Sequence, residues 1–365
     1  MQAMLIRRLR AASLRRFAEV ELEPGPGFNL IVGDNGSGKT SLLEAMHLMA
    51  HGRSFRGRVR DGLIRQGDPA LEVFLEWEDG GPLRHRGGLR HAGGNWEARI
   101  DGQSIGHLGE LCRALAVVTF EPGSHALVDG GSEVRRRYLD WGLFHVEHGF
   151  LEQWRRHARA LKQRNSLLRS GRADPQLDAW EHELAIAGEA LHQVRAVHVA
   201  QLAPFFQDAI ERLLPAAGTA RLELQPGWRQ QELALADALL LARERDLAQG
   251  HTSVGPHRAD LRLHLDGLPG REGLSRGQAK LTALALLLAQ AAQLAAHEGR
   301  WPVLQLDDLA SELDRQHQHR LLGLLAGTGA QVFVTGTELP AAFGGLEVEH
   351  RVFHVEHGAV RSATP

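Results

Sequence analysis

The stretch Gly33-Asp34-Asn35-Gly36-Ser37-Gly38-Lys39-Thr40 decides the fold of this chain of 365 residues. It follows an apolar segment, Phe28 to Val32, that reads as a β-strand, and it leads into a helical pattern from Thr40 to Ala50. Strand, glycine-rich loop and helix in this order are the context of a Walker A phosphate-binding loop. A glycine turn with a chance lysine is the plainer interpretation, and the complete eight-residue match argues against it.

Each residue type in this loop suits a polyphosphate. Glycines adopt positive φ angles and let the backbone approach an anion closely. Successive N–H groups, together with the N-terminus of the next helix, then point at phosphate oxygens. We expect Lys39 to reach the β- and γ-phosphates of ATP, and Thr40 to bind Mg²⁺. All residues from Gly33 to Ser41 are therefore assigned to ATP binding.

An acidic pair near the other end of the chain fits the same chemistry. Val303-Leu304-Gln305-Leu306-Asp307-Asp308 reads as a Walker B strand. We expect Asp307 to hold Mg²⁺ through a water molecule and Asp308 to orient the attacking water. Acidic residues end many strands, so the pair gains its meaning from the phosphate loop. Lys39 and Asp308 are the predicted catalytic residues.

Two further motifs lie near the acidic pair. Leu274-Ser275-Arg276-Gly277-Gln278 precedes a long apolar helical pattern, Gly277 to Ala296. Ser275 is a good N-cap and Gly277 lets the backbone approach an anion, so this helix N-terminus can bind phosphate or can simply be capped. Ser311-Glu312-Leu313-Asp314 follows the acidic pair, and its plain interpretation is a helix capped by Ser311.

Composition indicates a globular protein with neither disulfides nor membrane spans. The formal net charge is −2, and Cys112 is the single cysteine, which excludes a disulfide or a cysteine zinc site within one chain. Arginines interrupt Met1 to Arg16 too early for a signal peptide, and the apolar segment Leu281 to Ala296 is too short to span a bilayer. We therefore expect a cytoplasmic protein without membrane contact.

The order of patterns predicts an α/β fold with an inserted helical arm. Residues 1–130 combine the phosphate loop with an antiparallel meander, whose strands are expected at 71–77, 82–89 and 96–100. Residues 131–249 are predicted to be a helical arm, with one arginine-rich helix from Phe150 to Arg169 and a second that starts at Asp174-Pro175 and breaks near Pro204. Residues 250–365 complete the α/β part.

Three short segments admit two interpretations each. In Gly52-Arg53-Ser54-Phe55-Arg56, the side chains of Arg53 and Arg56 either meet DNA phosphates or lie in a solvated loop. Gly255-Pro256-His257-Arg258 forms a tight turn that structure alone explains. The sequence Phe-His-Val-Glu-His occurs at 144–148 and 353–357, and we expect ordinary histidines there rather than a metal site.

The phosphate loop, Leu-Ser-Arg-Gly-Gln and Asp-Asp–Ser-Glu-Leu-Asp, in this order, resemble ABC-type ATPase heads of the kind found in chromosome-structuring SMC proteins. Within that class the chain resembles the RecF family of bacterial recombinational repair proteins. The matching segments are spread over most of the chain and are Gly33 to Ala45, Gly52 to Arg56, Arg136 to Gly142, Gly255 to Asp260 and Leu274 to Lys280.

This resemblance implies an ATP-dependent DNA-binding protein that dimerises around two ATP molecules and hydrolyses them slowly. It implies action at single-strand gaps and gap junctions, on single- and double-stranded DNA, with RecO and RecR, to help load RecA. It also implies that Ser275, Arg276, Gly277 and Gln278 complete the ATP site of the partner subunit. Ser311 and Asp314 would then belong to the loop that connects the two nucleotides.

The chain departs from the wider ABC class at three positions. Asp308 stands where most of that class has glutamate, and its shorter arm is expected to slow hydrolysis. Thr335 follows a predicted strand at the place of the usual switch histidine, and Glu121 occupies the place of the Q-loop glutamine. The residue that senses the γ-phosphate is therefore left open.

Other ABC-type ATPases are the competing interpretation. The ATPase subunit of a membrane transporter fits poorly, because the predicted arm is large and arginine-rich. An SMC-type chromosome protein or its double-strand-break repair relative needs a long coiled coil, and no long heptad array is present. The hook of that relative also needs a Cys-x-x-Cys motif, which Cys112 alone cannot supply.

Overall fold

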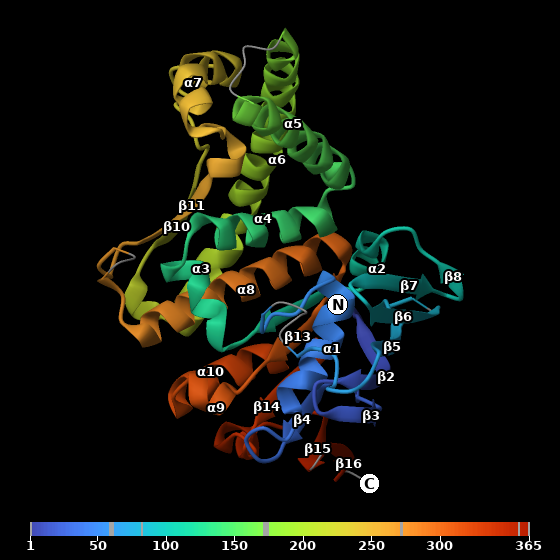
Figure 1. Ribbon diagram of the computed structural model, residues 1–365. Helices are drawn as coiled ribbons and strands as arrows, with labels where there is room; N and C mark the ends of the chain where they lie inside the picture. Colours follow the sequence, from blue (N-terminus) through green and yellow to red (C-terminus); the bar gives the residue numbers. More distant parts are fainter. Residues whose placement is uncertain are drawn as a thin grey trace. The chain divides into compact units, whose positions relative to one another are not determined.

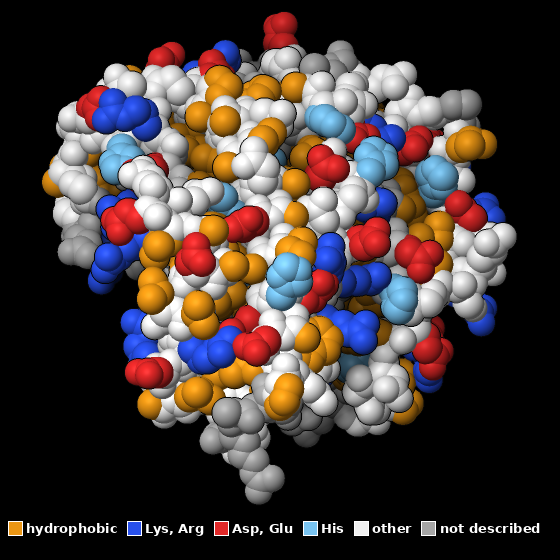
Figure 2. Space-filling view, turned by 90° about the horizontal axis from the view of Figure 1, so that it is seen from above, with side chains coloured by type: hydrophobic (Ala, Val, Ile, Leu, Met, Phe, Trp, Pro, Cys, Tyr) orange, Lys and Arg blue, Asp and Glu red, His pale blue; other side chains and the backbone are white. Residues whose placement is uncertain are grey.

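The computed structural model describes residues 2–57, 62–81, 83–170, 175–270, 273–356 and 358–363. The chain forms two compact units. The head unit comprises residues 1–124 and 291–365, and the arm unit comprises residues 125–290. Figure 1 labels most of the helices and strands of both. Basic and acidic side chains are interspersed on the face shown in Figure 2, in keeping with the near-neutral total charge.

A six-stranded sheet of the head unit has the order β16-β15-β4-β14-β13-β9. Five strands run parallel, and β16 pairs antiparallel with β15. β4, β9, β13 and β14 are buried along their whole length, as expected for parallel strands covered on both faces. Since β4 and β13 flank β14, the segments after β4 and β13 leave the same edge of the sheet. The bounds are β4 Phe28–Val32, β9 Val117–Phe120, β13 Val303–Leu306, β14 Val332–Gly336, β15 His350–Glu356 and β16 Ala359–Ser362.

Strands β15 and β16 have no counterpart among the predicted strands. Only Val355 and Phe353 of β15 are fully buried, so its sequence carries a weak strand signal. β15 nevertheless pairs in parallel with β4 and reaches the phosphate loop. A Cβ atom at Gly33 would lie 2.3 Å from the carbonyl oxygen of Val355, so glycine is required there. His354 is exposed, and residue 357 lies outside the described residues.

The second sheet of the head unit is the predicted antiparallel meander, extended to the order β3-β2-β5-β6-β7-β8. Leu71, Val73, Leu75 and Trp77 alternate along β5 and are buried on one face. The two-residue strands β1 (Gln2–Ala3) and β12 (Arg300–Trp301) pair in parallel. The bounds of the meander are β2 Leu5–Leu14, β3 Phe17–Leu22, β5 Ala70–Glu78, β6 Arg84–Ala92, β7 Asn95–Ile100 and β8 Gln103–Ser104.

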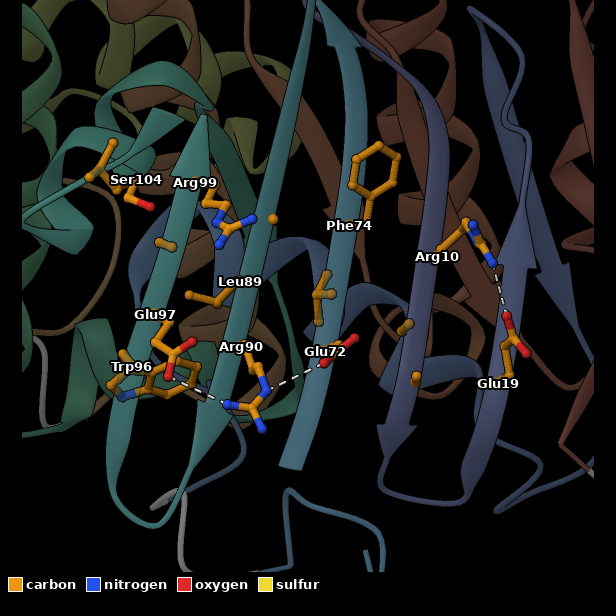
Figure 3. A pocket seen from close by; sticks show the side chains of 16 residues that line it. Arg10, Glu19, Glu72, Phe74, Leu89, Arg90, Trp96, Glu97, Arg99 and Ser104 are labelled. Carbon is orange, nitrogen blue, oxygen red and sulfur yellow. Dashed lines mark hydrogen bonds and ion pairs between the residues drawn. The ribbon is translucent and has the colours of Figure 1, made fainter. Parts of the chain in front are cut away.

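This antiparallel sheet is hollowed by a pocket of about 850 Å³, and the side chains that line it are drawn in Figure 3. Arg90 lies 3.4 Å from both Glu72 and Glu97, and Arg10 lies 3.0 Å from Glu19. Three arginines and three glutamates line the pocket in all, so their charges balance. The pocket therefore offers an anion no net attraction.

Helix α1 (Lys39–His51) starts directly from the phosphate loop and is buried along almost its whole length. It ends at Gly52, whose φ of 65° is left-handed and whose N–H donates to the Leu48 carbonyl. The other helices of the head unit are α2 (Leu108–Ala114), α9 (Leu309–Glu312) and α10 (Arg315–Ala326), with a 3₁₀ helix at Ala341–Gly345.

The arm unit contains α3 to α7 and a two-stranded sheet. α5 and α6 pack side by side (Figure 1), and β10 pairs antiparallel with β11. Helix α8 crosses the boundary between the two units. The bounds are α3 Ala126–Asp129, α4 Ser132–Val146, α5 Phe150–Ser170, α6 Pro175–Leu213, β10 Ala220–Gln225, α7 Leu235–Gln249, β11 Asp260–Leu265 and α8 Arg276–Glu298, with 3₁₀ helices at Pro122–His125, Pro215–Ala217 and Pro256–Arg258.

Two expectations for the arm are wrong. The predicted helical arm, residues 131–249, contains the strand β10, and α6 continues through Pro204 instead of breaking there. Pro204 and Ala200 are both exposed, so water can satisfy the Ala200 carbonyl that loses its helical partner. The N-cap expected at Asp174 lies outside the described residues.

The arm unit ends at Gln290, further along the chain than the predicted boundary at residue 249. The reason is tertiary. β11 needs β10 as its partner, and Asp260 at its start accepts two hydrogen bonds from the buried Arg135, at 2.7 and 3.0 Å. The Ala259 carbonyl accepts from Arg136 at 2.7 Å. The turn itself is held by structural contacts, since Gly255 N donates to the Gly227 carbonyl at 3.0 Å and the Pro256 carbonyl accepts from Arg195 at 2.8 Å.

A buried ionic cluster ties α5 to α6 and α7. Arg164 is fully buried and donates to Glu181 and Asp246, each at 2.8 Å. Thr252 accepts a further hydrogen bond from Arg164 at 2.9 Å. Removal of Arg164 would leave the fully buried Asp246 without this cationic partner, whereas Glu181 would keep its contact with Arg243. This arginine therefore stabilises the arm and is not available to a ligand.

Buried histidines should make the arm unit sensitive to acid. Burial lowers the pKa of His157 to about 3 and the pKa values of His198 and His257 to about 4, from an ordinary value of 6.5. Below about pH 6.5 these histidines therefore bind protons in the unfolded chain but remain neutral in the folded arm. Stability is complete above that pH and falls as the pH drops toward 4, by up to about 1.4 kcal/mol per pH unit for each histidine.

Urea denaturation between pH 7.5 and 5 measures this loss. His157→Gln should flatten the pH dependence, whereas His182→Gln, at an exposed position of α6, should leave it unchanged. An unfolding free energy that stays constant between these pH values would contradict the expectation.

Among the described residues, one helix, α8, is long and apolar enough to cross a membrane by length and composition. It has 23 residues, which is longer than the apolar segment expected from the sequence. Of its most apolar 18-residue window, 78% is buried inside the structure. Core helices of soluble proteins pass the same test, so this is weak evidence for a span.

Candidate functional site

The phosphate loop has the backbone geometry that anion binding needs. Gly33, Gly36 and Gly38 have φ angles of 154°, 77° and 119°. A Cβ atom at Gly38 would lie 2.6 Å from the ring of Phe17, so the turn between β2 and β3 supports the loop. The guanidinium of Arg16, in the same turn, donates to the Gly36 carbonyl. Ser37 Oγ is buried and has no hydrogen-bond partner among the described residues, so it is free to bind an anion.

Lys39 lies inside the loop and is only 8% exposed. Its Nζ donates to the carbonyl oxygens of Gly33 and Asp34 at 2.7 and 2.9 Å. Burial lowers the pKa of Lys39, while the charges of Asp308, Asp307 and Asp34 oppose that shift. The ammonium group therefore lies among the loop carbonyls, within the predicted phosphate-binding loop.

The structure brings Thr40 and Asp307 together, although 267 positions separate them. Thr40 Oγ1 donates to Asp307 Oδ1 at 2.9 Å. Thr335 Oγ1, at the end of β14, donates to the same oxygen at 2.7 Å. Burial raises the pKa of Asp307, and the two hydroxyl donors oppose that shift. A hydroxyl and a carboxylate side by side are oxygen ligands of the type that Mg²⁺ prefers, so the donor set fits that ion.

Asp308 has a left-handed backbone with a φ of 51°, which is uncommon for a residue other than glycine. Its N–H donates to Thr335 Oγ1 at 2.8 Å. Asp308 is half-buried, next to the almost fully buried Asp307. The backbone of Asp308 is thus held by the same hydroxyl that contacts Asp307.

Thr335 is a further residue of this site, although its position in the sequence indicates only that the usual switch histidine is missing. Thr335 is 1% exposed. Its hydroxyl donates to the Asp307 carboxylate and accepts from the Asp308 N–H. A threonine after an apolar strand carries no signal of its own. Only the adjacency of β14 and β13 places it beside the acidic pair.

Glu44 is a second residue that sequence patterns missed. It is fully buried in α1 and accepts two hydrogen bonds from Arg15, at 2.9 and 2.7 Å. Ser54 Oγ also donates to Glu44. This ion pair joins the β2–β3 turn, α1 and the Gly52–Arg56 segment, and so fixes the walls of the phosphate loop. Its charges are matched, as burial requires.

A polar chain ties α1 to β9 and β13. His47 Nδ1 lies 2.9 Å from Thr119 Oγ1, which donates to Gln305 Oε1 at 2.9 Å. Gln305 Nε2 donates to the Leu43 carbonyl at 3.3 Å. Burial lowers the pKa of His47 well below its ordinary value and that of the stacked His51 to about 4. Both rings are therefore neutral and structural.

The Leu274–Gln278 segment forms a reciprocal cap at the start of α8. Ser275 N donates to Gln278 Oε1 at 2.9 Å, and Gln278 N donates to Ser275 Oγ at 3.3 Å. Ser275, Arg276 and Gly277 are exposed. A Cβ atom at Gly277 would meet nothing within 4 Å. Both sequence interpretations are compatible with this geometry, because the cap is formed and the helix N-terminus still faces solvent.

The capping role expected for Ser311 is wrong. Ser311 lies inside the short helix α9, and the N-cap of the following helix, α10, is Asp314. Asp314 accepts from the backbone N–H of His317 at 3.0 Å and lies 2.7 Å from the Nδ1 of that histidine. Both Ser311 and Asp314 are exposed at the edge that carries the acidic pair.

Arg53 and Arg56 are exposed, and their charges act inside the head unit. Arg56 is among the groups that lower the pKa of Asp307, and Arg53 among those that lower the pKa of His47 and His51. Arg56 therefore lies within electrostatic range of the nucleotide site. Glu121, at the place of the Q-loop glutamine, accepts from the N–H of Gly123 at 2.5 Å.

Groups of three or more histidine, cysteine, aspartate or glutamate residues that could hold a metal ion are absent from the described residues. His145 instead packs against Trp141, with ring centroids 4.4 Å apart. Burial raises the pKa of the Cys112 thiol to about 11, so it is protonated at neutral pH. The oxygen pair of Thr40 and Asp307 remains the candidate site for Mg²⁺.

Known proteins resemble this chain in sequence and in fold. A family model described as an AAA domain matches residues 8–76. The DNA replication and repair protein RecF of Stenotrophomonas maltophilia (strain R551-3) is 60% identical over 361 residues, covering 98% of this chain and 99% of the relative. The solved structure of the recombination mediator protein RecF with ATP aligns with a TM-score of 0.88 at 26% identity, covering 99% and 98% of the two chains.

The fold is also shared with more distant ATPase heads. The Smc head domain of Pyrococcus furiosus aligns with a TM-score of 0.60 at 16% identity, over 99% of this chain and 96% of that one. This likeness concerns the fold alone, and it confirms the predicted ABC-type α/β head. Identity of 60% over nearly the whole length of both chains shows more: the chain belongs to the RecF family of DNA replication and repair proteins.

Proposed function

We propose that this protein is an ATP-operated DNA clamp. Two copies close around two ATP molecules, hold DNA while closed, and reopen when ATP is hydrolysed. One observation carries the proposal. Thr40, Asp307 and Asp308 meet beside the phosphate loop, while Ser275, Arg276 and Gly277 remain exposed at a helix N-terminus in the other unit. A nucleotide bound in the loop is therefore available to the signature segment of a second copy.

ATP and Mg²⁺ are the proposed ligands of the head unit. Backbone N–H groups of Gly33 to Ser41 surround the phosphates, Lys39 lies against them, and the Thr40 hydroxyl contacts the ion. Asp307 would help to hold Mg²⁺, which when bound would neutralise charge on the nucleotide phosphates. This arrangement agrees with the donor set of Thr40 and Asp307 and with the unpartnered Ser37 Oγ among the described residues.

Asp308 is the proposed catalytic carboxylate, which orients the attacking water. We infer slow, DNA-dependent hydrolysis, because an aspartate reaches less far toward the water than a glutamate would. Thr335 stands where many ABC ATPases have a switch histidine and holds both acidic residues. It is thus the candidate for coupling the γ-phosphate to the Walker B strand.

Replacement of Thr335 by valine should slow ATP turnover roughly 10–100-fold, as removal of outer-shell partners commonly does. The hydroxyl that donates to Asp307 and accepts from Asp308 is then lost, while the side-chain volume is kept. Phosphate release with saturating ATP measures the effect. Thr335→Ser keeps the hydroxyl and should retain turnover, and Thr337→Val, at an exposed position, is the matched control. Unchanged turnover in Thr335→Val would rule out this role.

The trans site is formed by Ser275, Arg276, Gly277 and Gln278 of one copy against the γ-phosphate of its partner's ATP. The proposed connecting loop, with Ser311 and Asp314, is exposed near the acidic pair and can meet a second copy. Asp314 also caps α10, which anchors the end of this loop to that helix. We infer an ATP-dependent homodimer on these grounds.

DNA, in single- and double-stranded and gapped forms, is the proposed substrate of the closed dimer. The RecF structure with ATP is described as belonging to the RecFOR pathway. We infer that this protein works with RecO and RecR, supports RecA, and acts in the cytoplasm. Arg53 and Arg56 remain candidate DNA contacts, although the charge of Arg56 also reaches Asp307.

Binding to gapped, duplex and single-stranded DNA, each with ATP and with ADP, tests the proposal. Binding should require ATP, favour gapped DNA, and weaken steeply as salt rises, since phosphate contacts release counterions. Binding that is as strong with ADP as with ATP, or that does not respond to salt, would contradict the clamp.

A further inference from the structure

Helix α5 of the arm unit carries a straight row of cations. Arg155, Arg159, Lys162 and Arg169 are all exposed and follow one another at intervals of four, three and seven residues. These intervals place them on one side of a helix, within about a quarter of its circumference. The buried residues of α5 lie on the opposite side and are Phe150, His157, Ala160, Arg164 and Leu168. We call these four cations the α5 stripe.

The cations of the α5 stripe are not neutralised by close ion pairs with other described residues. Among the described residues, none of its four cations makes an ion pair within 4 Å, although Arg159 acts at longer range on the pKa of Glu183. Their neighbours on α5 are paired. Arg156 contacts Glu183 at 2.5 and 2.9 Å, and Arg164 contacts Glu181 and Asp246. Positive charge is thus left over on one side of the helix only.

A groove borders the stripe between α5 and α6. It has a volume of about 630 Å³ and is lined by Arg155, Arg156, Arg159, Glu152, Ala179, Trp180 and Glu183. Trp180 is half-buried, and Ala179 lies beside it. The groove therefore offers an apolar surface next to Arg155 and Arg159, neither of which makes an ion pair with a described residue. That combination suits a sugar or base attached to a phosphate backbone.

We propose that the α5 stripe binds the phosphodiester backbone of DNA. This assignment rests on the proposed function as a DNA clamp and adds a contact surface on the arm. The stripe spans about 21 Å from Arg155 to Arg169 at 1.5 Å per helical residue. DNA carries a phosphate about every 3.4 Å along each strand, so several phosphates lie within that length. Arg155, Arg159 and Lys162 occupy three successive turns and Arg169 lies two turns further on, so all four can contact phosphates along such a backbone.

A nucleic acid fits this surface better than an acidic protein segment. Glu152 is the sole acidic residue in α5, and the stripe presents charge along a line rather than in a closed pocket. A line of cations beside an apolar groove is the arrangement of backbone-tracking surfaces. An acidic polypeptide is retained as one outcome of the test.

The triple variant Arg155→Ala/Arg159→Ala/Lys162→Ala tests the proposal. Arg169 is left in place because its side chain packs near Gly250. The matched control is Arg212→Ala/Arg221→Ala/Arg229→Ala, which removes the same charge from exposed arginines of the arm that already have ion-pair partners. Affinity for an oligothymidylate and for a duplex of equal length is measured with ATP over a series of salt concentrations, and circular dichroism checks folding.

The stripe variant should bind DNA at least about tenfold more weakly and should show a shallower salt dependence. Loss of three phosphate contacts lowers the slope of log affinity against log salt by about 2.7 for duplex and about 2.1 for single strands. If affinity falls more for one of the two DNA forms, that form is the one that contacts α5. ATP-dependent dimerisation should be unchanged, and the control variant should bind DNA as the unaltered protein does.

Two results would overturn the proposal while leaving the clamp intact. In one, the stripe variant binds both DNA forms like the control. In the other, it binds DNA normally but loses affinity for polyglutamate, which would assign the stripe to an acidic protein. If the unaltered protein itself fails to bind DNA with ATP, the proposed function falls and the stripe assignment falls with it.

Discussion

Replacement of Ser275 by arginine should abolish ATP-dependent dimerisation while each copy still binds ATP. Ser275 is exposed at the start of α8, and its neighbour Gly277 has open space around it. An arginine there fills the space that a partner's γ-phosphate would occupy. The nucleotide loop lies in the head unit and keeps all of its own contacts, such as those of Lys39. We expect dimer affinity to fall about 100-fold or more, as for a disrupted interface centre.

Sedimentation velocity with ATP and with ADP measures this effect, and titration with a fluorescent ATP analogue confirms binding. Ser275→Asn keeps an N-capping side chain and so separates loss of the cap, which costs about 1 kcal/mol, from loss of the interface. Ser170→Arg adds the same bulk and charge at an exposed position of the arm. ATP-dependent dimers of Ser275→Arg would refute the trans site.

Replacement of Lys39 by arginine should lower ATP turnover by roughly 10²–10³-fold and leave weak ATP binding. Removal of one preorganised donor at a developing charge has an effect of this size. Nζ of Lys39 fits between the Gly33 and Asp34 carbonyls at 2.7 and 2.9 Å, in a site that is 8% exposed. A planar guanidinium is too wide for this space and cannot replace a compact ammonium.

Single-turnover hydrolysis together with equilibrium ATP binding separates the two effects in Lys39→Arg. Lys39→Ala should weaken binding further, because it removes the positive charge altogether. Lys162→Arg makes the same exchange at an exposed position of α5 outside the nucleotide site, and it serves as the control in assays without DNA because Lys162 belongs to the α5 stripe. If the turnover rate of Lys39→Arg lies within about twofold of the rate of the unaltered protein, Lys39 does not act on the phosphates.

The parts of the site that were predictable are those whose chemistry is local. A phosphate loop needs its glycines, lysine and threonine in one continuous run, so the segment from Gly33 to Thr40 can be recognised from the sequence. The Walker B strand is a short apolar run with acids at its end, and Leu274 to Gln278 carries its own capping pattern. Each of these motifs can be recognised without knowledge of its neighbours in space.

Other features depend on contacts between distant segments and leave little trace in any one of them. Thr335 matters because β14 lies next to β13, and Phe17 matters because its ring fills the space beside Gly38. β10 lies in a region predicted to be a helical arm, and β15 has no predicted counterpart, because a few half-exposed residues give a weak strand pattern. α6 runs past Pro204 because packing on both sides outweighs one lost hydrogen bond.

The sequence by itself determined the class of this protein: an ABC-type head with Walker A and B motifs, a signature segment and an inserted arm, in an order typical of the RecF family. Tertiary structure alone decided how Asp307 meets Thr40 and Thr335, where the arm ends, and which arginines are satisfied. The physical reason is that a motif is a run of neighbouring residues. A hydrogen bond across 267 positions, or an arginine left without a partner, exists only after the chain has folded.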